Sequence, residues 1–269
     1  GQGVSAAGSG DVLLEARGSG GNVVINAEVV SVSGNITLDA GNDLTVSSSV
    51  STGGLGTVYM VAVNEIMVTE SVITVSGDIL VEAGTNLSQD AAITSTSGDV
   101  GLIAGGTLVQ TSTGDITTGG DVLVWAGTDW TMAGDAVITA IGNVVGEALG
   151  GDIGLGVISS TNVALTASDN IIDANGGSLN ITADNLSLRA TGGLIGDHDN
   201  ANGVAGQNAN ALDIAVSTLA ASADSGIYIS ELDDLMVTSV AALTVNLGSV
   251  LRPNFNSTTS SVARTRGTS

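Results

Sequence analysis

Residues that could do chemistry are sparse in this chain, and one short cluster stands out among them. The segment Asp197-His198-Asp199 places the only histidine between two carboxylates. Imidazole and carboxylate groups are both metal ligands. Three adjacent loop residues are a weak signal for a metal site, however, and a solvated loop tip is the better interpretation. We therefore predict no resident metal and no cofactor.

Calcium is the other cation to consider, because the chain has 27 acidic residues and calcium prefers clustered oxygen ligands. Neither the EF-hand spacing nor the GGxGxD nonapeptide of calcium-binding β-rolls occurs. The acidic turns could bind calcium adventitiously, but a dedicated site is not predicted.

Carbohydrate cleavage is the second chemistry that the acids could support. Glycoside hydrolysis needs two carboxylates about 5–10 Å apart beside a sugar-binding groove. Most acids here stand at turn or outward positions of a repeat, as Asp39, Glu82 and Asp121 do. Sugar grooves usually offer aromatic platforms, yet the chain has two Trp, two Tyr and one Phe. A polyuronate-cleaving site would need basic residues, and the body offers only Arg17 and Arg189. The sequence therefore predicts no enzyme.

The acidic residues recur at equivalent positions of a sequence repeat, so the fold of this repeat determines where they lie. Six glycines spaced 21 or 22 residues apart each open a similar strand that ends on alanine: Gly34, Gly56, Gly77, Gly98, Gly120 and Gly142. The strands are rich in Val and Ile and alternate with a period of two, which indicates β-structure. The period is too short for a helical-hairpin repeat. The sequence therefore predicts an all-β parallel β-helix, with one coil of three short strands per repeat and about twelve coils in all. The glycines are expected to reach the positive φ values that bend each coil at its corners.

The interior of the coil follows from the alternation of strand side chains. In the strand GDILVEA, Ile79, Val81 and Ala83 are predicted to face inward, and Leu80 and Glu82 outward. Stacked coils place equivalent residues about 4.7–4.9 Å apart, so each inward position should form an apolar column. Two further columns are predicted, one in the second strand (Leu44, Ile66, Leu87, Leu108 and Trp130) and one in the third (Val50, Ile73, Ile93, Ile116 and Ile138).

Four apolar residues take outward places in successive coils and could form an exposed stripe: Leu80, Ile103, Leu123 and Trp125. An apolar patch of this kind marks a partner surface more often than chance. A loop folded over it is an equally good interpretation. We predict that the stripe makes a lateral contact, either with another copy or with a covering segment.

Charge sets limits on the partners. The chain has no lysine, five arginines and a net charge of −22, which argues against binding of nucleic acid or anionic lipid. The sequence contains no run of eighteen apolar residues, so membrane insertion is not predicted. Three arginines lie near the carboxyl end, Arg252, Arg264 and Arg266. This tail could dock on the acidic body of the next subunit, or open coil ends could stack through strand pairing.

The pattern divides the chain into four parts. Regular coils are predicted over residues 1–190, a Gly/Asn-rich loop or insertion over 191–211, further coils over 212–247, and a Ser/Thr/Arg tail or linker over 248–269. The chain begins Gly1-Gln2-Gly3 without a positively charged signal segment. We therefore expect a piece of a longer protein.

The GD[IV]xLxA strands, the coil length near twenty residues, the high Gly/Ala/Thr/Asn content and the absence of Cys and Lys resemble the large, repetitive, secreted bacterial adhesins of the filamentous haemagglutinin-like type. The resemblance covers roughly residues 10–247, and the segment from Leu194 to Val237 looks like a unit that recurs in very long members. It implies a right-handed parallel β-helix, secretion across the outer membrane and a place on the cell surface. It brings no catalytic residues.

We therefore expect a structural and adhesive module of an exported, extracellular cell-surface or fibre-forming protein. It would act as a rigid spacer and interaction surface in cell adhesion or biofilm, and could self-associate into filaments. Its expected partners are other copies, neighbouring repeats, surface glycans or a partner cell. The alternative is a carbohydrate-binding or carbohydrate-cleaving β-helix protein.

Overall fold

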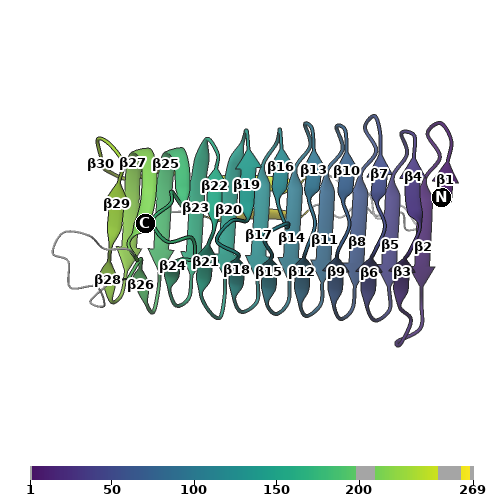
Figure 1. The fold of residues 1–269 in the computed structure, drawn as a ribbon, viewed down its shortest axis with the longest axis horizontal. Coiled ribbons are helices and arrows are strands. Elements are labelled where there is room, and N and C mark those ends of the chain that lie inside the picture. Colours follow the sequence, from purple (N-terminus) through teal and green to yellow (C-terminus); the bar gives the residue numbers. More distant parts are fainter. Residues whose placement is uncertain (1, 198–209, 248–261, 267–269) are drawn as a thin grey trace.

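The computed structural model describes residues 2–197, 210–247 and 262–266. Within these ranges the chain is all-β, and its parallel strands stack into a β-solenoid of about ten coils, about 22 residues apart. Figure 1 shows the coils side by side along the long axis, from purple near the amino terminus to green. The predicted parallel solenoid is confirmed. Twelve coils are too many, because residues 243–247 and 262–266 pair with one another in a separate antiparallel sheet.

Each coil has three strand positions, which form three faces of the solenoid. The strands of the long face have five or six residues, and six of the eight begin one or two residues after a repeat glycine: β2 (Val12–Ala16), β5 (Ile36–Ala40), β8 (Val58–Ala62), β11 (Ile79–Ala83), β14 (Val100–Ala104), β17 (Val122–Ala126), β20 (Asn143–Ala148) and β23 (Asn162–Ala167). The two exceptions are β2 and β23. The short face is a separate ten-stranded sheet: β3 (Val23–Ile25), β6 (Leu44–Val46), β9 (Ile66–Val68), β12 (Leu87–Gln89), β15 (Leu108–Gln110), β18 (Trp130–Met132), β21 (Ile153–Leu155), β24 (Ile171–Asp173), β26 (Leu194–Ile195) and β28 (Gly226–Ile227).

The third face completes the coil: β1 (Gln2–Ala6), β4 (Glu28–Ser31), β7 (Val50–Thr52), β10 (Val72–Thr74), β13 (Ile93–Ser95), β16 (Ile116–Thr118), β19 (Val137–Ala140), β22 (Val157–Ser159) and β29 (Ile229–Glu231). Two strands, β25 (Ile181–Ala190) and β27 (Leu212–Ala223), run through the third and long positions without a break. They join the two faces into one twenty-stranded sheet that also includes β30 (Met236–Val237).

The apolar columns of the interior are in register. Leu44, Ile66, Leu87, Leu108 and Trp130 pair one above the next along the short face, and each is at most 1% exposed. The long-face residues predicted to point inward are buried as well, while Leu80 points outward and joins a different cluster. Neighbouring coils therefore bury aliphatic groups against their own equivalents, which is the favourable term that holds the stack together.

The third column differs from its prediction at one residue. Val72, not Ile73, faces the interior between Val50 and Ile93, and Ile73 is 41% exposed. A shift of one residue in a strand exchanges its two faces. The signal that fixes the register is Thr74, which pairs with Thr52 and Ser95. These buried hydroxyls bond to carbonyl groups of repeat glycines, as in Thr52 Oγ1 to Gly34 O (2.6 Å) and Ser95 Oγ to Gly77 O (2.9 Å).

The repeat glycines are needed for a different reason than the one predicted. Within the described residues, the glycines with positive φ are Gly8, Gly54, Gly176 and Gly196, and none of them is a repeat glycine. At Gly77 a Cβ atom would lie 2.0 Å from the carbonyl oxygen of Gly56 in the preceding coil. Adjacent backbones approach too closely at this corner for any side chain.

Two expected segment boundaries also differ. Leu194–Ile195 form β26, which pairs with β24 and β28 on the short face, so a coil runs through part of the expected loop at 191–211. Residues 198–209 of that loop lie outside the described residues. At the carboxyl end, β31 (Leu243–Leu247) and β32 (Val262–Arg266) form an antiparallel hairpin that falls across the predicted boundary between coils and tail at 247.

Trp130 shows how strictly the interior volume is shared between coils. Its indole Nε1–H donates to Gln110 Oε1 (2.9 Å), and Gln110 Nε2 donates to Gln89 Oε1 (3.0 Å) inside the coil. In the long face next to it, Gly146 occupies the position that Val124 fills in the preceding coil. A Cβ atom at Gly146 would lie 2.3 Å from Trp130 Cζ3. Gly146 thus provides the space that the indole ring fills.

This pairing predicts strong coupling between the two positions. Gly146→Val should destabilise the chain by about 1–3 kcal/mol through overpacking, and Trp130→Leu by about 2 kcal/mol or more through a cavity. The double variant should lose about 1–3 kcal/mol less unfolding free energy than the sum of the two single variants. Some loss remains, because Gln110 no longer accepts a hydrogen bond from the indole. Urea denaturation followed by circular dichroism measures the cycle. Gly146→Val combined with the distant Leu44→Val serves as the control and should be additive. Additive costs for the Trp130 pair would contradict the shared-volume interpretation.

Candidate functional site

The predicted apolar stripe lies on the outer side of the long face, but in two rows rather than one. Leu80 and Leu123 belong to one row, separated by Gly101, whereas Ile103 and Trp125 are direct neighbours in the adjacent row. The first row also contains apolar side chains that the prediction did not name, namely Tyr59, Val145 and Ala164. All of these residues belong to one apolar cluster outside the coil.

The strand β31 covers part of this outer cluster. It contacts β17, β20 and β23, and Val245 is completely buried within the cluster while Leu243 packs at its margin. Leu80, Ile103 and Leu123 are at most 9% exposed, and Trp125 is half-buried. The yellow ribbon behind the solenoid in Figure 1 is β32 (Val262–Arg266), the strand that pairs with β31. A segment of the same chain therefore packs against the stripe.

Polar groups border the covered cluster. The Tyr59 hydroxyl donates to the Glu82 carboxylate. Glu147 follows Trp125 in its row and is only 6% exposed. Of the three tail arginines, Arg252 lies outside the described residues. Arg264 and Arg266 are in β32, where their backbones pair with Val245 and Leu243. The hairpin thus brings two arginine positions of the tail to the covered face of the molecule's own body.

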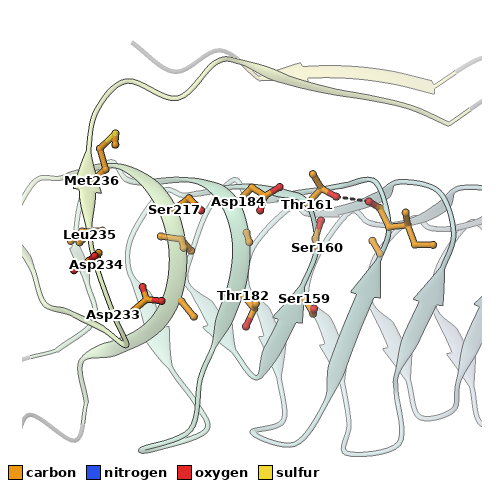
Figure 2. A pocket seen from close by; sticks show the side chains of 15 residues that line it. Ser159, Ser160, Thr161, Thr182, Asp184, Ser217, Asp233, Asp234, Leu235 and Met236 are labelled. Carbon is orange, nitrogen blue, oxygen red and sulfur yellow. Dashed lines mark hydrogen bonds between the residues drawn. The ribbon is translucent and has the colours of Figure 1, made fainter.

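A groove of about 980 Å³ lies near the carboxyl-terminal end of the coil stack. Its floor is formed by β19, β22, β25 and β27, and the segment that follows β29 closes one side. Figure 2 shows Ser159 and Thr182 on the floor, and Asp233, Asp234 and Leu235 on the closing segment. This groove was not predicted from the sequence, because its floor residues are spread from Ala140 to Ser217 and meet the closing segment 233–236 only when the coils stack.

The lining of the groove is acidic and hydroxylic with apolar edges. Asp184, Asp233 and Asp234 supply carboxylates, and Ile141, which is 72% exposed, and Met236 supply apolar surface. Some hydroxyl groups are already engaged with the backbone, as Thr161 Oγ1 donates to Ile141 O (2.6 Å). The described lining has no histidine, lysine or arginine. Such a surface can accept hydrogen bonds from a neutral polyhydroxylated ligand, and its charge opposes an anionic one.

The predicted His-carboxylate cluster is only partly described. The Asp197 N–H donates to Asn210 O (2.7 Å), while His198 and Asp199 lie outside the described residues. Within the described ranges, no three His, Cys, Asp or Glu side chains gather closely enough to hold a metal ion. The same ranges contain no helix with the length and hydropathy of a membrane span.

The corner before each long strand carries a row of stacked polar side chains. The backbone N–H of Asp99 donates to Asp78 Oδ1 (2.9 Å), and the N–H of Asp121 donates to Asp99 Oδ1 (2.8 Å). Burial raises the pKa of Asp99, and the negative charges of Asp78 and Asp121 raise it further, against the opposing hydrogen bond from the Asp121 backbone. These acids close turns, and the stacking that aligns them sets like charges one above another.

Comparisons with protein-family models, with curated proteins and with solved structures found no match. The resemblance to filamentous haemagglutinin-like adhesins therefore stays a prediction beyond the β-solenoid repeat fold itself.

The stacked aspartates predict how stability depends on pH. Because the pKa of Asp99 is raised in the folded chain, the folded state binds a proton more readily than the unfolded chain, and the cost of ionised Asp99 disappears as pH falls through this pKa. Asp99→Asn retains a carbonyl acceptor for the Asp121 N–H, as Asn35 does for Thr57 (3.0 Å). This variant should be more stable than the parent at pH 7 by roughly 0.5 kcal/mol, and the difference should vanish near pH 4.

Thermal melting between pH 7 and pH 4 measures this difference. Asp135→Asn is the matched control, because Asp135 is an exposed turn residue and its replacement changes the net charge equally. Two outcomes would show that the stacked charges do not oppose folding. In one, both variants raise the melting temperature equally at pH 7. In the other, the increase caused by Asp99→Asn becomes larger as pH falls.

Proposed function

We propose that this chain is a structural and adhesive module of an exported cell-surface or fibre-forming protein. The observation that supports this role is the continuous, in-register apolar interior of about ten coils. At the spacing of parallel strands, ten coils extend about 45–50 Å. A coil stack of this kind maintains its length because each coil is held by its neighbours on both sides. The module would act as a rigid spacer that presents repetitive side faces.

The surface chemistry supports adhesion rather than catalysis. Most carboxylates are distributed along turns, and the three in the described groove lining, Asp184, Asp233 and Asp234, lie among hydroxyl and aliphatic groups without an aromatic sugar platform. The net charge of −22 favours solubility and opposes contact with nucleic acid or anionic lipid. We further propose an extracellular location and contacts with other copies, with surface glycans or with a partner cell, in line with the adhesin resemblance. No cofactor takes part in this role.

The groove supports a second candidate, the binding of a neutral glycan. Its hydroxyl and carboxylate groups match the hydrogen-bonding groups of a sugar, and Ile141, Leu235 and Met236 could contact the apolar faces of sugar rings. The part of the lining that the structure describes has no aromatic platform, so binding would be shallow and weak. Adhesion through this groove would still fit a surface module.

Beads coated with the full chain test the role directly. We expect them to adhere to bacterial or epithelial cells above albumin-coated beads, and we expect no reducing sugar to be released from a polysaccharide panel. Asp233→Asn/Asp234→Asn removes two groove charges, whereas Asp135→Asn/Asp90→Asn makes the same charge change elsewhere. Loss of adhesion in the groove variant alone would assign it to glycan binding. Release of reducing ends would replace the proposal with an enzyme, and no adhesion to any cell or glycan would contradict it.

A further inference from the structure

The outward side of the third face carries an uninterrupted row of hydroxyl groups. Five successive strands of this face, β13, β16, β19, β22 and β25, each contribute one residue, and these residues pair directly one above the next: Thr94, Thr117, Thr139, Ser159 and Thr182. All five are exposed or half-buried, and the row is bounded by Ile73 and Ala215. At the spacing of parallel strands, the five residues span about 19 Å along the solenoid.

The hydroxyls of this row take no part in holding the coil together. The inward hydroxyls that follow them in the same strands do, since Ser95 Oγ donates to Gly77 O (2.9 Å) and Thr118 Oγ1 donates to Gly98 O. Among the residues that the structure describes, by contrast, none of the five outward hydroxyls has a hydrogen-bond partner. Each of them can therefore both donate a hydrogen bond to a ligand and accept one from it.

Strand propensity alone does not account for the row. Threonine favours strand positions, and the outward row of the short face also contains hydroxyl side chains. On that face, however, they alternate with apolar residues, in the order Thr45, Met67, Ser88, Val109 and Thr131. The third face differs because it keeps a hydroxyl group in every coil from β13 to β25.

The hydroxyl row runs into the groove near the carboxyl-terminal end of the stack. Ser159 and Thr182 belong to both, and Figure 2 shows them on the groove floor. Beside the row, Ile141 is 72% exposed and provides an apolar edge, while Asp184 offers a carboxylate that accepts hydrogen bonds. Row and groove together form one straight track, which residues 233–236 wall on one side at its groove end.

We propose that this hydroxyl track, the row from Thr94 to Thr182 together with the groove, binds an extended, neutral β-1,4-linked glucan along the solenoid axis. The sugar units of such a chain repeat at a distance close to the rise of one coil, so each coil can offer one hydroxyl to one sugar. A glucan that coils cannot follow a straight row. The net charge of −22 opposes an anionic polymer. The inference rests on glycan binding by the groove, the second candidate above, and gives that site a ligand class.

The track predicts that binding depends on ligand length and shape. The described lining has no aromatic platform, so affinity comes from hydrogen bonds that are individually weak and must add up over several sugars. Cellobiose can cover only part of the groove floor, whereas cellohexaose reaches along the row. Maltohexaose has the same composition and length as cellohexaose but coils, and it is the matched control ligand.

Saturation-transfer NMR of the full chain with these three oligosaccharides tests the proposal. We expect the dissociation constant of cellohexaose to be about fivefold or more below those of cellobiose and maltohexaose, because more hydrogen bonds form. Thr117→Val and Thr139→Val remove one hydroxyl but keep a branched side chain. Each should weaken cellohexaose binding about two- to tenfold, the value of one hydrogen bond. Thr131→Val makes the same change in the outward row of the short face and should leave binding unchanged.

The outcomes separate this inference from the functions proposed above. Equal binding of cellohexaose and maltohexaose would overturn the track and leave a glycan site in the groove. The same holds if Thr117→Val and Thr139→Val bind like Thr131→Val while Asp233→Asn/Asp234→Asn loses binding. If none of the three oligosaccharides binds, the track and glycan binding by the groove both fail. Adhesion of coated beads to cells would still support the spacer role in that case.

Discussion

The structure depends on one constraint, which is that each side chain must lie directly over its counterpart about 4.8 Å away in the next coil. Aliphatic residues satisfy this constraint by packing on their own kind, as Leu87 does between Ile66 and Leu108. A larger residue needs a smaller neighbour that leaves space for it. The indole of Trp130 therefore coincides with Gly146, and its N–H ends an internal row of glutamine amides. Buried polar side chains are satisfied either in such a row or, as for Thr52 and Ser95, by backbone carbonyl groups.

The same constraint has a cost at the corners. Stacked turns align carboxylates as regularly as they align leucines, and Asp78, Asp99 and Asp121 follow one another through backbone hydrogen bonds. The backbone–carboxylate bonds close the turns, while the charges repel. The fold tolerates this repulsion because the apolar columns run from coil to coil. The negative charge also disfavours edge-to-edge aggregation of strands.

Much of the fold could be predicted because the repeat itself reports the register. The column from Leu44 to Trp130 follows from spacing alone. Ile73 was placed wrongly because Val72 and Ile73 are both apolar, and only the buried hydroxyl of Thr74 distinguishes the two registers. The hairpin over Leu123 and Val145 could not be located, because its contacts join residues about 100 positions apart and follow no repeat. Alternation in LTVNL and VARTR marks two strands but not where they lie.

Distances between spin labels on the short face test the stacking most directly, since the chain has no native cysteine. Val24, Val109, Thr131 and Ile172 occupy one outward row, with Val24 four, five and seven coils from the others. The Cα separations from Val24 should be about 19, 24 and 34 Å, a constant rise of about 4.8 Å per coil. Separations that do not grow linearly with coil number, or a Val24–Ile172 distance shorter than Val24–Thr131, would contradict the coil stack and the functions inferred from it.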